Sequence, residues 1–566
     1  MKDRMTTMRG PRALSVMIAI MFATSAVAMI FTADADDGAF TDKALGEGGD
    51  VLNKINFGGA GYDVFSDIIK VPGGFVAVGY SAASSFGTGD WVGPDGGAIE
   101  GYGGTDATIV KFTDNWSIAW KTHFGGAGED VFFGVTIVEK APATGTNAVN
   151  NGYLLVAVGY SGKGSFFIPE GTGEGYWVEN EIEGYGDDDA IIVAFDWETG
   201  AVEYALNFGG AGDDGFTGVT VSKEGNICAV GYSYANSFGS GIWQANQMNE
   251  GYGGIDAVMA VYTDGALLYA RHFGGAGNDI FYGVAAYGEG VDEFFYAVGY
   301  SGSTSFGNGS WADENWGVAS GYGGKDAIIV GYNNGTVYGA ANFGGAADDE
   351  FRGVGVGAYG DVFAVGFSQA GSFGNGSWAD ENWGVASGYG GDDAIIVAYG
   401  EEGELIGAAN FGGAAIDAFN GVAVSPEGSI VAVGFSQANS FGNGSWADVT
   451  GNGVDDAIAV GYSEGEFVGA MNFGGAGGDG FTGAVLLPNG NVLVVGSSDV
   501  GSFGTGDWAG VEGKGGIDAI VVMFDTGMET SGTGGGNDFP VTYVAIAAVG
   551  IVALLGIAYV FVLKKP

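Results

Sequence analysis

Short runs of apolar residues, separated by glycine-rich turns, recur along the middle of this 566-residue chain. Four successive runs in one stretch occupy residues 351–356, 362–368, 393–399 and 404–411. Short apolar runs bounded by turn residues are typical of β-strands, and short connections favour antiparallel pairing. The pattern therefore predicts consecutive antiparallel strands, which we name a to d, from the innermost outward, within each repeat.

The group of four runs is itself repeated seven times. Each copy carries the string Phe-Gly-Gly-Ala, and the mean interval between copies is about 69 residues. Four strands per repeat at this period predict an all-β fold, a seven-bladed β-propeller of four-stranded antiparallel blades, with a β-solenoid as the alternative. The string begins at Phe57, Phe124, Phe208, Phe273, Phe343, Phe411 and Phe473.

The two ends of the repeat array complement each other. The last repeat supplies strands a, b and c, ending at residues 520–524, and has no d strand of its own. Residues 51–57 form a lone d-type run before the first a strand. We therefore expect this N-terminal strand to close the ring, which favours the propeller and removes the edges of an open array.

Three motifs recur in the repeats: Gly-Gly-Ala-Gly-x-Asp-x-Phe, Ala-Val-Gly-Tyr-Ser with Ser-Phe, and Gly-Gly-x-Asp-Ala-x-x-Val. In these motifs the chain resembles the bacterial seven-bladed-propeller repeat family, the SBBP-type β-propeller repeats, over roughly residues 51–525. The resemblance implies a propeller in an extracellular or surface protein, without a shared reaction or catalytic residues. The chain departs from the family pattern in its longer segment between strands b and c, which repeatedly carries Trp.

The two termini predict export and a membrane anchor. Basic residues precede an apolar run at 13–31, as in a secretory signal, although an uncleaved anchor is the alternative. A second apolar run before Lys564 and Lys565 is long enough for a transmembrane helix, and the lysines predict a cytoplasmic tail. The predicted organisation is a signal peptide at 1–35, a propeller ectodomain at 36–529, a Gly/Ser/Thr-rich stalk at 530–540, a transmembrane helix at 541–563 and a cytoplasmic tail at 564–566.

Composition narrows the classes of partner and chemistry. The 67 Asp plus Glu against 18 Lys plus Arg give a net charge of −49, which argues against nucleic acid as a partner. Cys228 is the single cysteine, so no intramolecular disulfide forms, and we interpret it as a small buried apolar side chain. His123 and His272 share a repeat position with Asn in the other copies, so we interpret both as structural.

Two series of aspartates run through all seven repeats, each where a glycine-rich turn enters a strand. A short carboxylate there accepts backbone N–H groups and holds the turn. Calcium binding is the alternative, but neither series has the Asp-x-Asp-x-Asp spacing with a closing Glu, so we expect no cofactor or metal. The first series is Asp63, Asp130, Asp214, Asp279, Asp349, Asp417 and Asp479; the second is Asp106, Asp189, Asp256, Asp326, Asp393, Asp456 and Asp518.

One Trp per repeat lies between strands b and c. Turns of an antiparallel meander alternate ends, so the b-to-c segments and the d-to-a turns share one face, which we call the loop face. Trp in glycine-rich loops on this face predicts a candidate binding surface, with packing over the blade's own or a neighbouring strand as the alternative. The residues are Trp91, Trp177, Trp243, Trp311, Trp378, Trp446 and Trp508.

Five Asn-x-Ser/Thr sequons suit an exported protein as candidate glycosylation sites, although Asn-Gly is also an ordinary turn pair. They are Asn115, Asn308, Asn334, Asn375 and Asn443.

No lone, non-repeated set of acid, base and nucleophile indicates an enzyme. We therefore expect a single-pass cell-surface propeller for binding, adhesion or display, with carbohydrate or an envelope protein as its partner. A structural envelope component is the first alternative, and a secreted carbohydrate-active enzyme is the second.

Overall fold

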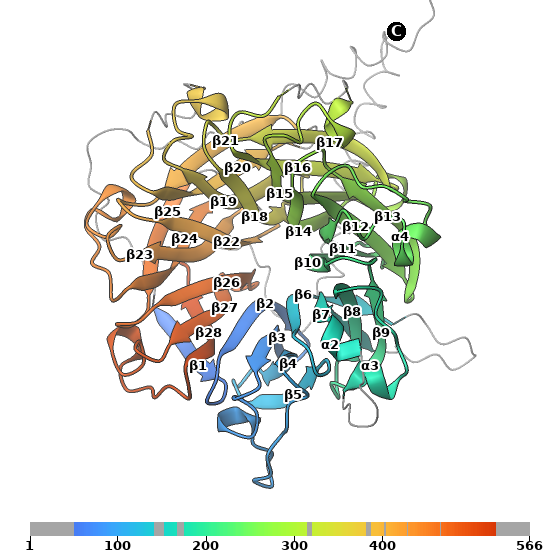
Figure 1. Cartoon of the computed structure of the whole chain (residues 1–566). Helices are drawn as coiled ribbons and strands as arrows, with labels where there is room; N and C mark the ends of the chain where they lie inside the picture. The colour runs from blue at the N-terminus through green and yellow to red at the C-terminus, as the bar shows by residue number, and fades with distance from the viewer. Residues whose placement is uncertain are drawn as a thin grey trace, which may run out of the picture.

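The computed structural model describes residues 50–140, 152–166, 175–313, 320–380, 387–400, 403–426, 428–463 and 466–527. These residues form seven four-stranded antiparallel sheets arranged as blades around a central axis (Figure 1). In each sheet the first strand after the Phe-Gly-Gly-Ala turn is innermost, and the strand that ends in the next Phe is outermost. The predicted seven-bladed propeller of four-stranded blades is confirmed.

The first four blades follow one another along the chain. Blade 1 comprises β2 (Asp63–Val71), β3 (Gly74–Ala82), β4 (Thr105–Thr113) and β5 (Ile118–Phe124). Blade 2 comprises β6 (Asp130–Glu139), β7 (Tyr153–Gly162), β8 (Asp188–Asp196) and β9 (Val202–Phe208). Blade 3 comprises β10 (Asp214–Val221), β11 (Ile227–Tyr234), β12 (Ile255–Thr263) and β13 (Ala266–Phe273). Blade 4 comprises β14 (Asp279–Tyr287), β15 (Phe294–Gly302), β16 (Lys325–Asn333) and β17 (Thr336–Phe343).

The last three blades include the one built from both ends of the array. Blade 5 comprises β18 (Asp349–Val356), β19 (Val362–Gln369), β20 (Asp392–Tyr399) and β21 (Leu405–Phe411). Blade 6 comprises β22 (Asp417–Val424), β23 (Ile430–Gln437), β24 (Asp455–Ser463) and β25 (Glu466–Phe473). Blade 7 comprises β26 (Asp479–Leu486), β27 (Asn491–Asp499), β28 (Ile517–Asp525) and β1 (Val51–Phe57).

The b-to-c segments carry short helical turns. They include α2 (Lys163–Phe166) and α3 (Tyr176–Glu179) in blade 2 and α4 (Gly241–Ala245) in blade 3, and the equivalent Trp-bearing turns of the other blades are 3-10 turns.

Ring closure follows the expected scheme. Strand β1 pairs antiparallel with β28, and the register runs from Val51 opposite Phe524 to Phe57 opposite Ala519. In Figure 1 the blue N-terminal strand lies beside the red C-terminal strands of the same blade. Both ends of the array are therefore held in one sheet, and the ring has no open blade edge facing a missing neighbour.

The innermost strands approach one another closely along the central axis. Strand a bulges in every blade, and the residue that directly follows the bulge is Gly in six of them. A Cβ at Gly218 would lie 2.8 Å from the carbonyl oxygen of Tyr282 in the next blade, so glycine is required there. Blade 1 has Asp67 at this position, and its Oδ2 accepts the N–H of Val135 at 2.9 Å.

The core is divided among the junctions between blades. Seven clusters of buried apolar residues each combine side chains from two successive blades. At the closing junction, for example, Leu493 and Val521 of blade 7 pack with Phe65 and Trp91 of blade 1. Stability therefore comes mainly from the stacking of neighbouring repeats, because a single blade has no core of its own.

The predicted transmembrane helix is the part of the fold class that requires correction. Across the described part of the chain, no helix has both the length and the apolar character needed to cross a bilayer, since the helices there have only four or five residues. The segments predicted as signal peptide (1–35), stalk (530–540), transmembrane helix (541–563) and tail (564–566) lie outside the described residues. The structure therefore supports the seven-bladed propeller and does not support the predicted transmembrane helix.

Candidate functional site: the loop face

The seven Trp side chains, predicted as a binding surface, are buried between the blades. Each is at most 1% exposed and belongs to the apolar cluster between its own blade and the preceding one. Trp91 meets Phe57 of blade 7 edge-on, with ring centroids 5.3 Å apart, and tilts against Phe86 at 4.8 Å. The prediction that these rings face a ligand therefore needs correction, because the neighbouring blade covers them. The packing alternative matches their position.

Buried serine and aspartate side chains form a hydrogen-bond network around each Trp. In blade 5 the indole N–H of Trp378 donates to Ser368 Oγ at 3.0 Å. Asp349 Oδ2 accepts the N–H of Gly345 and the hydroxyl of Ser372, both at 2.8 Å. The same Trp-to-Ser bonds in the seven blades measure 2.8 to 3.1 Å, and every first-series Asp accepts the equivalent Gly and Ser donors.

The first-series carboxylates are at most 3% exposed. Burial raises the pKa of Asp214 and of Asp349 to about 7, although serine and backbone donors act in the opposite direction. The pKa values of Asp130 and Asp279 rise to about 6 for the same reason. These carboxylates hold the Phe-Gly-Gly-Ala turns and lie too deep to touch a ligand.

The second-series carboxylates hold the ends of the b-to-c segments. Each accepts, on Oδ2, the N–H of the residue four positions earlier, at 2.7 or 2.8 Å. In five blades an Asn on strand d also donates to this oxygen; Asn342 lies 2.6 Å from Asp326 Oδ2. The predicted turn-holding role agrees with these bonds in both Asp series.

The two histidines replace that Asn in blades 1 and 3. His123 Nε2 lies 3.7 Å from Asp106 Oδ2, beyond hydrogen-bond distance, and burial lowers the pKa of His123 to about 4. Without the Asn donor, burial raises the pKa of Asp106 and of Asp256 to about 7. Both histidines are therefore neutral packing residues at physiological pH. Cys228 is fully buried in strand β11, as its apolar neighbours predicted.

A series of tyrosines, which the sequence reasoning missed, occupies the exposed part of the loop face. They are the residues that donate their backbone N–H to the second-series Asp, and Gly stands on each side of them. Four of the five are 41 to 46% exposed, and Tyr102 is half-buried. We call this set the tyrosine arc: Tyr102, Tyr185, Tyr252, Tyr322 and Tyr389.

Each exposed tyrosine lies against the next blade. A Cβ at Gly309 of blade 4 would be 2.7 Å from Cγ of Tyr252 in blade 3, and a Cβ at Gly376 would be 2.8 Å from Cγ of Tyr322. Both glycines have φ near +54° themselves, at the start of the turn that carries the buried Trp. The arc therefore lies at the junctions between blades, and the buried Asp side chains hold its backbone N–H groups.

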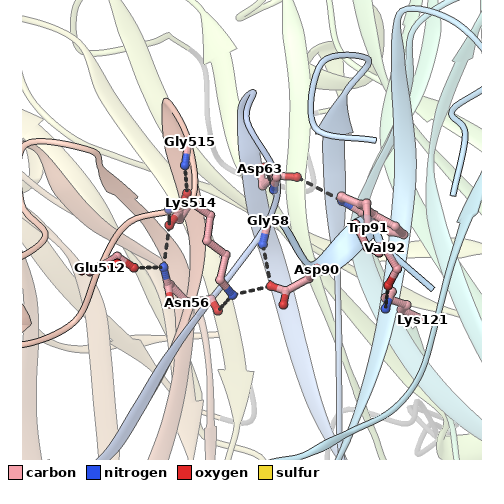
Figure 2. Close-up of polar contacts among 12 residues, drawn as sticks. Asn56, Gly58, Asp63, Asp90, Trp91, Val92, Lys121, Glu512, Lys514 and Gly515 are labelled. Atoms are coloured by element: carbon pink, nitrogen blue, oxygen red, sulfur yellow. Dashed lines mark hydrogen bonds and ion pairs between the residues drawn. The ribbon is translucent and has the colours of Figure 1, made fainter. Parts of the chain in front are cut away.

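Blades 6 and 7 interrupt the arc with polar residues. Asn452 takes the tyrosine position in blade 6, and its Nδ2 lies 3.4 Å from Asp507 Oδ2 of blade 7. Lys514 takes it in blade 7, donates to the carbonyl of Asn56 at 2.6 Å and pairs with Asp90 of blade 1. Figure 2 shows Lys514 reaching across the closing junction toward Asp90, which also accepts the N–H of Gly58. An ion pair thus bridges the two blades at ring closure.

The five predicted glycosylation sites are all exposed. Asn308, Asn375 and Asn443 each precede the 3-10 turn that carries Trp, with extended backbone. Their modification stays a prediction. Within the described ranges, no group of three or more His, Cys, Asp and Glu side chains is arranged to hold a metal ion, and the expectation about cofactors also stays a prediction.

Comparison with solved structures finds proteins of very different sequence. The WD40 propeller domain of Doa1 is 12% identical, with 84% of this chain and 96% of that chain covered and a TM-score of 0.38. Sqt1 of Chaetomium thermophilum, bound to the N-terminus of ribosomal protein L10, is 11% identical, with 83% and 98% covered and a TM-score of 0.36. A quinohemoprotein alcohol dehydrogenase from Pseudomonas putida is 10% identical, with 91% and 82% covered and a TM-score of 0.35.

Likenesses at this level carry no argument about activity or partners, and the propeller assignment rests on the strand order of this chain. No family model matches the chain and no curated protein matches it, so the SBBP-type resemblance stays a prediction.

Proposed function

We propose that this propeller is a non-catalytic binding module that holds its partner on the loop face, through the tyrosine arc. A β-propeller is commonly a binding or protein-interaction module, and its fold alone selects no partner. The observation that carries the proposal is the exposure of four equivalent tyrosines at successive blade junctions, each 41 to 46% exposed. Exposed aromatic rings on a rigid support lose little entropy on contact with a ligand.

The support beneath the arc favours a binding role. The backbone N–H of Tyr322 is held by Asp326 at 2.8 Å, and the ring rests on Gly376 of the next blade. A ring fixed in this way presents its free area in one orientation, so binding does not first have to order it. Repetition over successive blades suits a partner that makes several weak contacts at once.

The proposal includes a location outside the cytoplasm. The signal predicted at 1–35 and the exposure of the five sequon asparagines support export, because glycan attachment requires accessible side chains. Adhesion or display at a cell surface is the role that such a position gives to a binding face.

The test measures saturable binding of the purified full-length chain to cell-envelope fractions and to a panel of polysaccharides. One variant carries Tyr185→Leu, Tyr252→Leu, Tyr322→Leu and Tyr389→Leu. The control carries Tyr338→Leu and Tyr359→Leu, two exposed tyrosines on strand β17 and on the a-to-b hairpin of blade 5. We expect the arc variant to lose about tenfold or more in affinity, while the control keeps it.

Equal binding by the wild type and the arc variant would reject the arc as the contact surface. A chain that binds no fraction and instead forms ordered self-associated layers would favour the structural envelope alternative.

A further inference from the structure

Blades 1 to 3 add a carboxylate to each position of the tyrosine arc. The string Glu-Gly-Tyr stands at residues 100–102, 183–185 and 250–252, and all three glutamates are exposed. Blades 4 and 5 have Ser320 and Ser387 where these glutamates stand. The arc therefore has an acidic part on three adjacent blades and an uncharged part on the next two.

The charge around the acidic part is not balanced by nearby cations. The described b-to-c segments of blades 1 to 3 (82–105, 163–166, 175–188 and 235–254) contain one basic residue, Lys163. Its Nζ lies 3.0 Å from Asp187 Oδ1. Two further cations lie near the blade 1 segment: Lys514 pairs with Asp90, and Lys121 Nζ lies 3.5 Å from the carbonyl oxygen of Val92. The described segments also expose Asp95, Glu179 and Glu181, so the surface around the three Glu-Gly-Tyr strings is strongly negative.

The aromatic part of these sites suits a cation as well. The ring of Tyr252 stacks on His272 with centroids 4.4 Å apart and an interplanar angle of 28°, lies against Gly309, and still leaves the residue 43% exposed. Tyr102 lies tilted against His123, with centroids 4.5 Å apart and an interplanar angle of 39°. Burial lowers the pKa of both histidines to about 4, so at neutral pH neither repels a cation on the ring. A tyrosine face attracts a guanidinium or ammonium group.

We infer that the acidic part of the arc binds a cationic polypeptide segment, with Arg or Lys side chains over Tyr102, Tyr185 and Tyr252 and paired with Glu100, Glu183 and Glu250. This inference rests on the proposed function and names the partner's chemistry. Charge complementarity favours this occupant, because a neutral polysaccharide would gain nothing from the excess negative charge. Arg is preferred over Lys, since a planar guanidinium stacks on the ring and bonds a carboxylate at the same time.

The test uses a fluorescein-labelled peptide of alternating Arg and Gly, titrated with the purified full-length chain and followed by fluorescence anisotropy. We expect saturable binding that weakens with salt, and tighter binding than that of the Lys-Gly peptide. The triple variant Glu100→Gln/Glu183→Gln/Glu250→Gln should lose about tenfold or more in affinity. Tyr102→Leu/Tyr185→Leu/Tyr252→Leu should lose a similar factor, whereas the three Tyr→Phe changes should stay within about twofold, because Phe keeps the ring.

Two controls separate this site from general charge attraction and from the rest of the arc. Glu139→Gln/Glu198→Gln/Asp292→Asn removes the same charge from exposed positions at the opposite ends of the strands and should leave the affinity unchanged. Tyr322→Leu/Tyr389→Leu removes the uncharged part of the arc. It should lower the affinity for the peptide less than the tyrosine variant of blades 1 to 3 does.

The outcomes distinguish the inference from the proposed function. If the peptide fails to bind, or binds equally to all variants, while polysaccharide or envelope binding still depends on the tyrosines, the inference is overturned and the binding function stands. If neither kind of ligand depends on the tyrosine arc, both are overturned.

Discussion

In blades 1 to 5 the b-to-c segment carries two recurrent aromatic positions with opposite surroundings. The Trp donates to a buried Ser and is covered by the preceding blade, whereas the Tyr, eight to eleven residues later, lies against the next blade and is exposed in blades 2 to 5. In blade 5 the pair is Trp378, 1% exposed, and Tyr389, 43% exposed. The Trp therefore packs in the core between two blades, whereas the Tyr is accessible to a partner.

The strongest test of this comparison removes one member of each kind. Trp378→Ala leaves a cavity between blades 4 and 5 and removes the indole donor to Ser368 Oγ, so we expect the free energy of unfolding to fall by about 3–5 kcal/mol. Tyr389→Ala should cost about 1 kcal/mol or less, because much of the ring is already in water. Urea unfolding followed by tryptophan fluorescence and by circular dichroism measures both.

A similar loss of stability in the two variants would contradict the division into structural and exposed aromatics.

The buried Asp network that supports the Trp should make stability depend on pH. An acid whose pKa is higher in the folded state binds more protons when folded, so its contribution is complete below about pH 4 and is lost as the pH rises through about 7. The pKa values of Asp214 and Asp349 are raised to about 7. We therefore expect the midpoint of urea unfolding to fall steadily between about pH 4 and about pH 8.

Relief of surface repulsion acts in the same direction, so variants must separate the two causes. Asp349→Asn cannot titrate and should flatten the slope between about pH 5 and about pH 8, whereas Glu139→Gln, an exposed change, should leave it nearly intact. Stability that rises with pH across this window would contradict the buried network as its source.

The smallest expected effect concerns the support beneath a tyrosine. Asn342→Ala removes the donor 2.6 Å from Asp326, so we expect a loss of about 1–2 kcal/mol in stability and a further rise in the pKa of that carboxyl. Because Asp326 clamps the N–H of Tyr322, ligand affinity at blade 4 should also fall. Urea unfolding and binding assays on Asn342→Ala, with Asn115→Ala as an exposed control, measure both effects.

An Asn342→Ala variant with unchanged stability and unchanged ligand affinity would show that the clamp does not position the tyrosine.

The fold was predictable because the same local rules apply seven times. Glycine turns, apolar runs and the Asp at each turn are local features, so their repetition along the chain identified the blades, the missing d strand and the N-terminal strand that replaces it. The turn role of Asp63 and Asp106 followed from residues within four positions of each carboxylate. The predicted terminal segments lie outside the described residues, and no described helix crosses a membrane.

The candidate site was less predictable because exposure depends on the neighbouring blade. Trp offered a large ring in a glycine-rich loop, which suggested a ligand contact, but the sequence does not reveal that Phe57 covers Trp91. The tyrosine signal was present as Gly-Tyr-Gly, four residues before the second-series Asp in five repeats, and was overlooked beside the more prominent Trp.

The number of blades, their strand order and the closure of the ring could be predicted from the amino-acid pattern, because they depend on repeated local turns and apolar runs. Which aromatic rings reach the surface became clear only from the folded ring. That outcome depends on contacts between blades, such as the pairing of Lys514 with Asp90, whose positions are 424 residues apart. Residues so distant in the chain meet only when the ring closes, and burial is a property of that closed ring.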